Sequence, residues 1–166
     1  MRLSLFKSVV KTALGMNKKT PLQIGQPAPE LGVADEAGVR WTLTSAKNQP
    51  FVLYFYPKDD TPGCTKESCA FRDAAPGLGT LGVRVFGASR DSLAAHLAFK
   101  QKYNLNFPLL LDPDGALATR WGVADGDVAR RVTFLVDKAG IIRGVWDPVS
   151  VSGHAEEVAQ ALRALA

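Results

Sequence analysis

The stretch Phe51-Val-Leu-Tyr-Phe-Tyr-Pro57-Lys-Asp-Asp-Thr61-Pro-Gly-Cys64-Thr-Lys-Glu-Ser-Cys69 joins an apolar run to a turn and then to both cysteines of the chain. Residues 51–56 are apolar on both faces and rich in aromatic side chains, which predicts a fully buried strand. The turn predicts a helix from residue 61 or 62 to about residue 75, where Pro76 and Gly77 should break it. Cys64 is therefore expected at the N-terminus of a helix.

The rest of the chain alternates predicted strands with predicted helices. The other strands that we expect are short and apolar: residues 39–43, 83–88 and 109–111. The helices that we expect between and after them are residue 91 or 92 to 103 and about 115–121. Residues 132–145 predict a β-hairpin. A last helix should follow Gly153 and direct four side chains inward: Val158, Ala161, Leu162 and Leu165. This order predicts an α/β fold with a central mixed β-sheet flanked by helices, similar to the thioredoxin-like fold.

The positive charge of the chain is concentrated at its N-terminus. The net charge is +4, and residues 1–20 contain five basic residues and no acidic one: Arg2, Lys7, Lys11, Lys18 and Lys19. The remaining residues carry 15 basic and 16 acidic side chains, a net charge of −1. Because this part has no basic run, we expect no nucleic-acid binding. We expect residues 1–20 to be a basic extension and residues 21–166 to form the domain.

The extension has apolar residues near one helical face: Leu3, Phe6, Val10 and Leu14. Lys7 and Lys11 interrupt the apolar core that a secretory signal requires, so we expect no export and a cytoplasmic protein. A basic amphipathic helix can contact a membrane surface or act as a transit peptide. For residues 1–18 we favour a poorly anchored extension, or a helix packed on its own domain, over membrane contact.

The two cysteines lie five positions apart, and this spacing favours a reactive pair over a disulfide framework. The thiolate is the nucleophile, and a helix N-terminus stabilises an anion there. A static disulfide or two inert buried thiols are the alternatives. The histidines, His96 and His154, lie far outside the spacing of a zinc site, so we expect neither a metal nor a cofactor. A dithiol oxidoreductase would carry C-x-x-C instead.

The motif Pro57-x-x-x-Thr61-x-x-Cys64 resembles the active-site signature of the peroxiredoxins. Residues 54–69, followed by Phe71-Arg-Asp73, resemble the peroxiredoxin Q or bacterioferritin comigratory protein subgroup, whose members are atypical 2-Cys enzymes. Two further segments match motifs of the family, one that opens its domain and one that carries its active-site arginine: Gly25-Gln-Pro-Ala-Pro29 and Arg131-Val-Thr-Phe-Leu-Val-Asp137. The resemblance covers residues 22–166.

The resemblance implies a peroxidase that reduces hydrogen peroxide and organic hydroperoxides, with Cys64 as the nucleophile that becomes a sulfenic acid. Arg131 would stabilise the thiolate, and the Thr61 hydroxyl would bond the sulfur or the peroxide. Pro57 would shape and dry the pocket. The N–H groups of Gly63 and Cys64 would point toward the peroxide oxygens.

Cys69 would be the resolving cysteine. On an intact helix, the Cα atoms of residues i and i+5 lie about 8–9 Å apart, whereas a disulfide requires about 4.4–6.8 Å. We therefore expect the helix after Cys64 to unwind before an intramolecular disulfide closes. By resemblance, the reductant is thioredoxin or a similar dithiol protein, and resolution within one chain makes a monomer sufficient.

The sequence is compatible with two interpretations of function. The first is the peroxidase, and the second is a redox-sensing or holdase-type binding protein that uses the cysteine pair as a switch. Thr61 and Arg131 favour the peroxidase, because a switch needs no groups that polarise a peroxide. Around the site we expect Lys66 and Glu67 to be solvated surface, and Asp59 and Asp60 to be helix caps.

Overall fold

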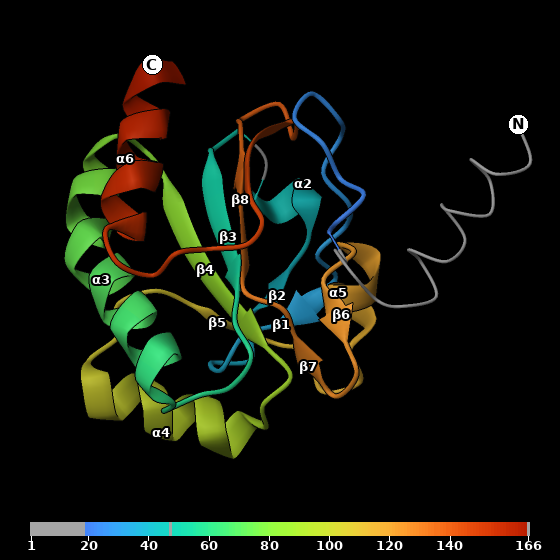
Figure 1. Ribbon diagram of the computed structural model, residues 1–166, viewed down its shortest axis with the longest axis vertical. Coiled ribbons are helices and arrows are strands. Elements are labelled where there is room, and N and C mark those ends of the chain that lie inside the picture. The colour runs from blue at the N-terminus through green and yellow to red at the C-terminus, as the bar shows by residue number, and fades with distance from the viewer. Residues whose placement is uncertain (1–18, 47, 166) are drawn as a thin grey trace, which may run out of the picture.

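A five-stranded mixed sheet forms the centre of the fold (Figure 1). The computed structural model describes residues 19–46 and 48–165, so the predictions for residues 1–18 lie outside the described residues. The strands of the sheet are, in chain order, β3 (Phe51–Phe55), β4 (Arg84–Ser89), β5 (Leu109–Leu111), β8 (Val132–Val136) and β9 (Ile142–Trp146). Their spatial order is β5-β4-β3-β8-β9.

The central strand, β3, pairs in parallel with β4 and antiparallel with β8. All five of its residues are buried, as expected for a strand covered on both faces. In the register with β8, Phe55 faces Val132. The residues that follow β3 and those that precede β8 therefore lie at the same end of the sheet.

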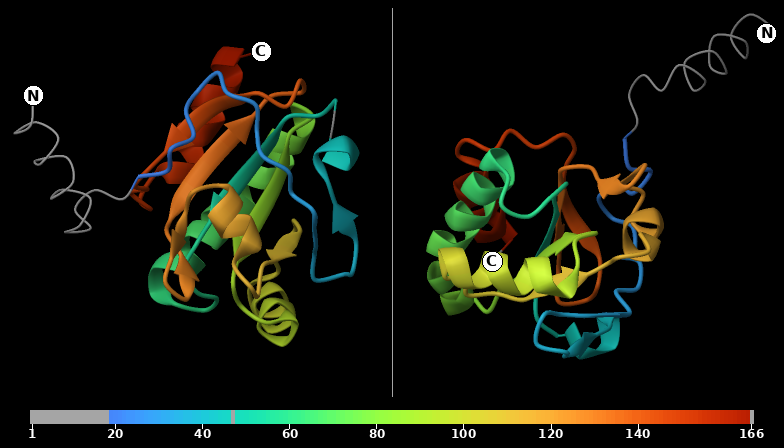
Figure 2. Two further views of the ribbon diagram at one scale, coloured as in Figure 1. Left: turned by 90° about the vertical axis from the view of Figure 1, so that its right-hand side faces the viewer. Right: turned by 90° about the horizontal axis from the view of Figure 1, so that it is seen from below.

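Helices cover both faces of this sheet (Figure 2). On one face, α3 (Pro62–Thr80) and α6 (His154–Leu165) lie over the sheet, and α4 (Leu93–Tyr103) adds Phe99 to the same apolar cluster. On the other face lie α2 (Leu43–Ala46) and α5 (Ala116–Arg120), where Trp121 is buried. The predicted α/β architecture is thus confirmed.

Several strand predictions differ from the structure in detail. The strand expected at residues 39–43 is only β2 (Arg40–Trp41), because Leu43 already begins α2. Three further short strands were not predicted: β1 (Val33–Ala34), which pairs with β2, and β6 (Ala124–Asp125), which pairs with β7 (Val128–Ala129). The predicted strands at 51–56, 83–88 and 109–111 and the hairpin at 132–145 are present.

The predicted end of α3 near residue 75 is wrong, since the helix continues through Pro76 to Thr80. Proline has no N–H, so the Arg72 carbonyl one turn earlier loses its helical partner. The Asn106 side chain replaces that partner, because its Nδ2 donates to the Arg72 carbonyl at 3.1 Å. Leu78 is buried and holds the last turn against the core.

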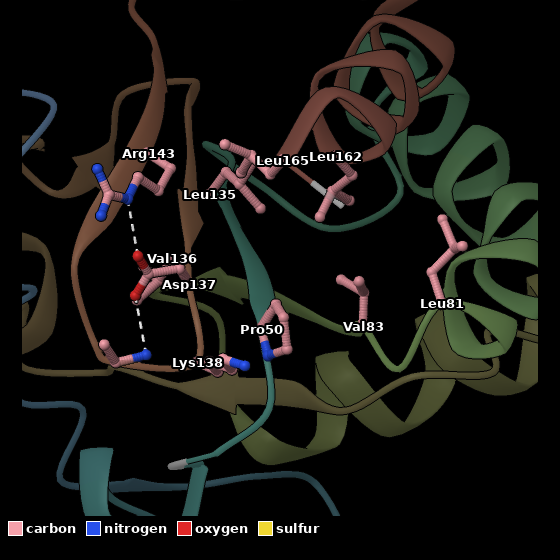
Figure 3. A pocket seen from close by; sticks show the side chains of 11 residues that line it. Pro50, Leu81, Val83, Leu135, Val136, Asp137, Lys138, Arg143, Leu162 and Leu165 are labelled. Atoms are coloured by element: carbon pink, nitrogen blue, oxygen red, sulfur yellow. Dashed lines mark hydrogen bonds and ion pairs between the residues drawn. The ribbon is translucent and has the colours of Figure 1, made fainter.

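At the end of the sheet opposite Cys64, an apolar groove of about 440 Å³ begins beside Pro50 (Figure 3). Leu162 and Leu165 of α6 line it, and Leu165 is 50% exposed. The prediction that Leu165 points inward is therefore wrong, because its side chain lies at the open groove, whereas Leu162 three residues earlier is buried. Among the described residues, no helix is both long and apolar enough to cross a membrane.

Candidate active site

Cys64 lies at the N-terminus of α3, directly after the loop that leaves the carboxyl end of β3. Thr61 is the N-cap residue in an extended conformation, and Pro62 occupies the first helical position, where its missing N–H costs nothing. The Thr65 N–H donates to the Thr61 carbonyl at 2.8 Å. The preceding N–H groups of Gly63 and Cys64 therefore lie at the open end of the helix, which favours an anion.

Arg131 reaches the cysteine from the segment just before β8. Its Nη2 lies 3.3 Å from the Cys64 sulfur, and its Nη1 donates to Glu67 Oε1 at 2.8 Å. A Cβ on Gly63 would lie 3.2 Å from Nη2, so glycine leaves the space that the guanidinium needs. Burial opposes the positive charge, but Glu67 and Cys64 together raise the pKa of Arg131. The structure thus brings Cys64 and Arg131 together, and the side chain of Cys64 is buried.

Glu67 is buried, with 1% of its surface exposed, so the prediction that it is solvated surface is wrong. Oε1 bonds Arg131, and Oε2 has no hydrogen-bond partner among the described residues. Burial raises the pKa of the Glu67 carboxyl to about 7, although Arg131 lowers it in part. A signal for this role exists in the sequence, because residues i and i+3 share one helical face and Glu67 follows Cys64 by three. Lys66, on the neighbouring face, is exposed.

Thr61 and Pro57 belong to the loop between β3 and α3. The Thr61 hydroxyl donates to the Lys58 carbonyl at 2.8 Å, rather than to the Cys64 sulfur. Its proton is thereby committed, and the lone pairs of the oxygen remain to accept a hydrogen bond from a substrate O–H. Pro57 opens the loop directly after the buried Tyr56 and is itself half-buried.

The same loop is anchored by Asp59, which is buried. Its carboxylate accepts from the Tyr56 hydroxyl at 2.6 Å and faces His96 Nδ1 at 2.6 Å. Its N–H donates to the Asp91 carboxylate at 2.9 Å. Asp59 therefore positions the loop, and the prediction that it or Asp60 caps the helix is wrong, because the N-cap residue is Thr61.

Three side chains of this network have the composition of a cation site, namely Asp59, Asp91 and His96. His96 Nε2 lies 2.9 Å from the Leu110 carbonyl. This oxygen can only accept, so Nε2 carries a proton. Both ring nitrogens are thus engaged within the protein, and the cluster is explained as a hydrogen-bond network.

Cys69 lies on the second turn after Cys64 and is half-buried. Both thiols are free, and α3 is continuous around them. Between them, Ser68 shares a 2.8 Å hydrogen bond with the Tyr54 hydroxyl. The structure therefore represents the reduced form, with the two cysteines on one intact helix.

The sequence profile of the AhpC/TSA family matches residues 24–145. The chain belongs to this family. A Coxiella burnetii relative named peroxiredoxin bcp is 46% identical over 146 residues, which cover 82% of this chain and 96% of the relative. Peroxiredoxin Bcp of Bacillus subtilis is 39% identical over 150 residues, covering 86% of this chain and 96% of the relative. The expected family and subgroup are thereby confirmed.

Solved structures agree with the fold as well. The crystal structure of a mutant of Xylella fastidiosa PrxQ has a TM-score of 0.81 at 34% identity and covers 88% of this chain and 98% of its own. Peroxidoxin BcpB of Mycobacterium tuberculosis has a TM-score of 0.81 at 30% identity, with 87% and 99% covered. The AhpC/TSA protein described here is a thiol-dependent peroxidase with the thioredoxin-like fold, and the alternative of a non-enzymatic switch is not favoured.

Proposed function

We propose that Cys64 is the peroxidatic cysteine and Cys69 the resolving cysteine of this peroxidase. One observation carries the assignment: the Arg131 guanidinium lies 3.3 Å from the buried Cys64 sulfur at the N-terminus of α3. A permanent positive charge and a helix N-terminus both stabilise the thiolate. Cys69 makes no hydrogen bond to a cation among residues 19–46 and 48–165, and the nearby Arg72 instead bonds Asp73 and the Tyr103 carbonyl.

In the first step the Cys64 thiolate attacks one oxygen of ROOH. An S–O bond forms, the O–O bond breaks, and RO⁻ leaves and takes a proton to become ROH. Arg131 and the N–H groups of Gly63 and Cys64 stabilise the negative charge as it moves onto the leaving oxygen. Thr61 accepts a hydrogen bond from the peroxide, and Pro57 limits the access of water to the loop.

In the second step the Cys69 thiol attacks the Cys64 sulfenic acid. An S–S bond forms within one chain, and water leaves. Because positions i and i+5 of an intact helix are too far apart for a disulfide, the first turns of α3 must unwind. A dithiol protein of the thioredoxin type then reduces the disulfide and becomes oxidised itself, and α3 re-forms.

The substrates that we propose are hydrogen peroxide and organic hydroperoxides. A structurally similar protein supports the second class, because a study of the Xanthomonas campestris bacterioferritin comigratory protein, at 32% identity and a TM-score of 0.78, concerns alkyl peroxide reduction. The monomeric state and the cytoplasmic location stay predictions, as does the absence of membrane contact by residues 1–18.

Peroxide consumption with a thioredoxin regenerating system tests the assignment. Cys64→Ser should abolish the reaction with peroxide, because it removes the nucleophile. Cys69→Ser should complete one turnover and then stall or over-oxidise, because the sulfenic acid has no partner. If Cys64→Ser consumed peroxide as fast as the wild type, the assignment would be wrong.

A further inference from the structure

The residues just before α3 are fixed to α4. The Asp59 carboxylate faces His96 Nδ1 at 2.6 Å, and both side chains are buried. Asp60 makes two further bonds, because Oδ1 accepts from the Tyr103 hydroxyl at 2.7 Å and Oδ2 from Lys102 Nζ at 2.8 Å. Two consecutive residues are thus held by three side chains of one helix.

The middle of α3 is hydrogen-bonded to the last residue of α4 and to the loop that follows it. Arg72 Nη1 donates to the Tyr103 carbonyl at 2.7 Å. The Arg72 carbonyl, which Pro76 leaves without a helical partner, accepts from Asn106 Nδ2 at 3.1 Å. Tyr103 therefore bonds residues on both sides of the segment that contains the two cysteines, through its hydroxyl to Asp60 and through its carbonyl to Arg72.

The supporting element does not depend on the first turns of α3. Phe99 of α4 is buried and its ring packs against Tyr56 at the end of β3, and His96 Nε2 donates to the Leu110 carbonyl on β5. Lys100 Nζ donates to Glu36 at 2.7 Å and to the Phe107 carbonyl at 3.1 Å. These contacts involve strands and loops outside α3, so α4 and residues 104–106 can keep their place when α3 opens. We call residues 93–106 the α4 frame.

Between these two attachment points, at residues 61–71, the contacts of α3 are ones that the resolving step must break. Arg131 bonds Cys64 and Glu67, and Tyr54 bonds Ser68. Each bond runs from the first turns of α3 to the sheet side of the site and none to the α4 frame. Opening also returns the buried Glu67 carboxyl, with its unpartnered oxygen, to water.

We propose that the α4 frame fixes both ends of residues 61–71, so that the unwinding needed for resolution is confined to this segment. Tyr103 and Arg72 are then positioning residues for the resolving step, an inference that rests on the proposed function. The remainder of α3, residues 73–80, stays helical in the disulfide form. It provides a template on which the first turns re-form after reduction, since extending a helix is easier than nucleating one.

Hydrogen–deuterium exchange of the reduced and the oxidised protein tests whether unwinding is confined to residues 61–71. Mass spectrometry first establishes that the 64–69 disulfide has formed. The absence of this disulfide would contradict the proposed function rather than the confinement of unwinding by the α4 frame. In the wild type, oxidation should lower the protection of amides 66–71 by about 100-fold or more, while amides 77–80 and 97–103 change by less than about threefold. Equal loss of protection throughout 66–80 would overturn the proposal.

Variants of Arg72, at the C-terminal end of the segment, test the proposal further. In oxidised Arg72→Ala, amides 73–75 and 77–80 should lose about tenfold in protection, because one charge-assisted hydrogen bond to Tyr103 is removed. Arg72→Lys should restore part of it. Arg163→Ala, which removes an exposed pair with Glu156 on α6, is the matched control. If Arg72→Ala changes the reduced and oxidised forms equally, the residue is merely structural and the proposal fails.

The N-terminal end of the segment, which Asp60 fixes, is tested with a variant that removes a single oxygen atom. Tyr103→Phe deletes the bond to Asp60 but keeps the carbonyl that accepts from Arg72. In the oxidised form it should lower the protection of the Asp59 amide several-fold and leave amides 77–80 unchanged. Loss of protection at amides 77–80 instead would contradict the proposal that Asp60 and Arg72 are fixed separately at the two ends of the segment.

Discussion

Arg131 bonds two side chains at once, the Cys64 sulfur at 3.3 Å and Glu67 Oε1 at 2.8 Å. A guanidinium can do this because its donors are held in a planar fork, whereas a lysine ammonium is a compact charge on a flexible stem. Gly63 keeps the approach open. At the scale of single residues, Arg131 is therefore the side chain that connects the nucleophile to the rest of the site.

Arg131→Lys should lower the second-order rate constant for the reaction of Cys64 with peroxide by about 10–100-fold. The variant retains a positive charge but loses one charge-assisted hydrogen bond, which contributes roughly 1.5–3 kcal/mol. Stopped-flow measurement of the reduced enzyme with hydrogen peroxide gives the rate constant. Arg143→Lys, at an exposed pair with Asp137, is the matched control. A similar loss in both variants would contradict the role of Arg131.

At the scale of elements, α3 contains a buried carboxyl group, Glu67, whose ionisation destabilises the first turns of the helix. Glu67 lies beside Arg131, Cys64 and Tyr54, and burial raises the pKa of its carboxyl from the ordinary value of 4.5 to about 7. An acid with a raised pKa binds more protons in the folded helix than in the unwound one. The stability of the intact helix therefore falls as pH rises from about 4.5 to 7, by up to about 3 kcal/mol, and is constant above that range.

The exchange of the amides in the first turns of reduced α3 should report this titration. Once the intrinsic exchange rate is corrected for, the wild type should open about 10–100-fold more often at pH 8 than at pH 5. Glu67→Gln should remove most of this difference, because its amide does not titrate. Lys66→Gln, on the exposed face of the same turn, is the control. A pH dependence that persists in Glu67→Gln would show that another group is responsible.

At the scale of the whole molecule, the sequence predicted those features that local signals specify. The run at residues 51–56 is buried in the central strand, and the turn that follows places Cys64 at a helix N-terminus. Thr61 and Arg131 were expected from the motif, and the structure brings Arg131 to the sulfur. The strand and the helix start depend on a few neighbouring residues, whereas the long-range approach of Arg131 was expected only from the resemblance to the family.

The features that the sequence did not predict depend on partners far along the chain. Pro76 remains helical because Asn106 supplies the missing donor. Glu67 is buried because Arg131 lies opposite it. Asp59 is not a cap because His96, which follows it by 37 residues, faces its carboxylate. No local pattern reports such a contact, since each forms only when the sheet has brought the two segments together.

In the proposed reaction, Cys64 attacks the peroxide and Cys69 resolves the product within the same chain. Single-turnover mass spectrometry of the reduced protein with one equivalent of hydrogen peroxide tests it most directly. We expect a monomer that has lost two hydrogen atoms, with Cys64 and Cys69 linked, and in Cys69→Ser a sulfenic acid located on Cys64. A sulfenic acid on Cys69 in Cys64→Ser at the wild-type rate, or a disulfide between two chains, would contradict these roles of Cys64 and Cys69.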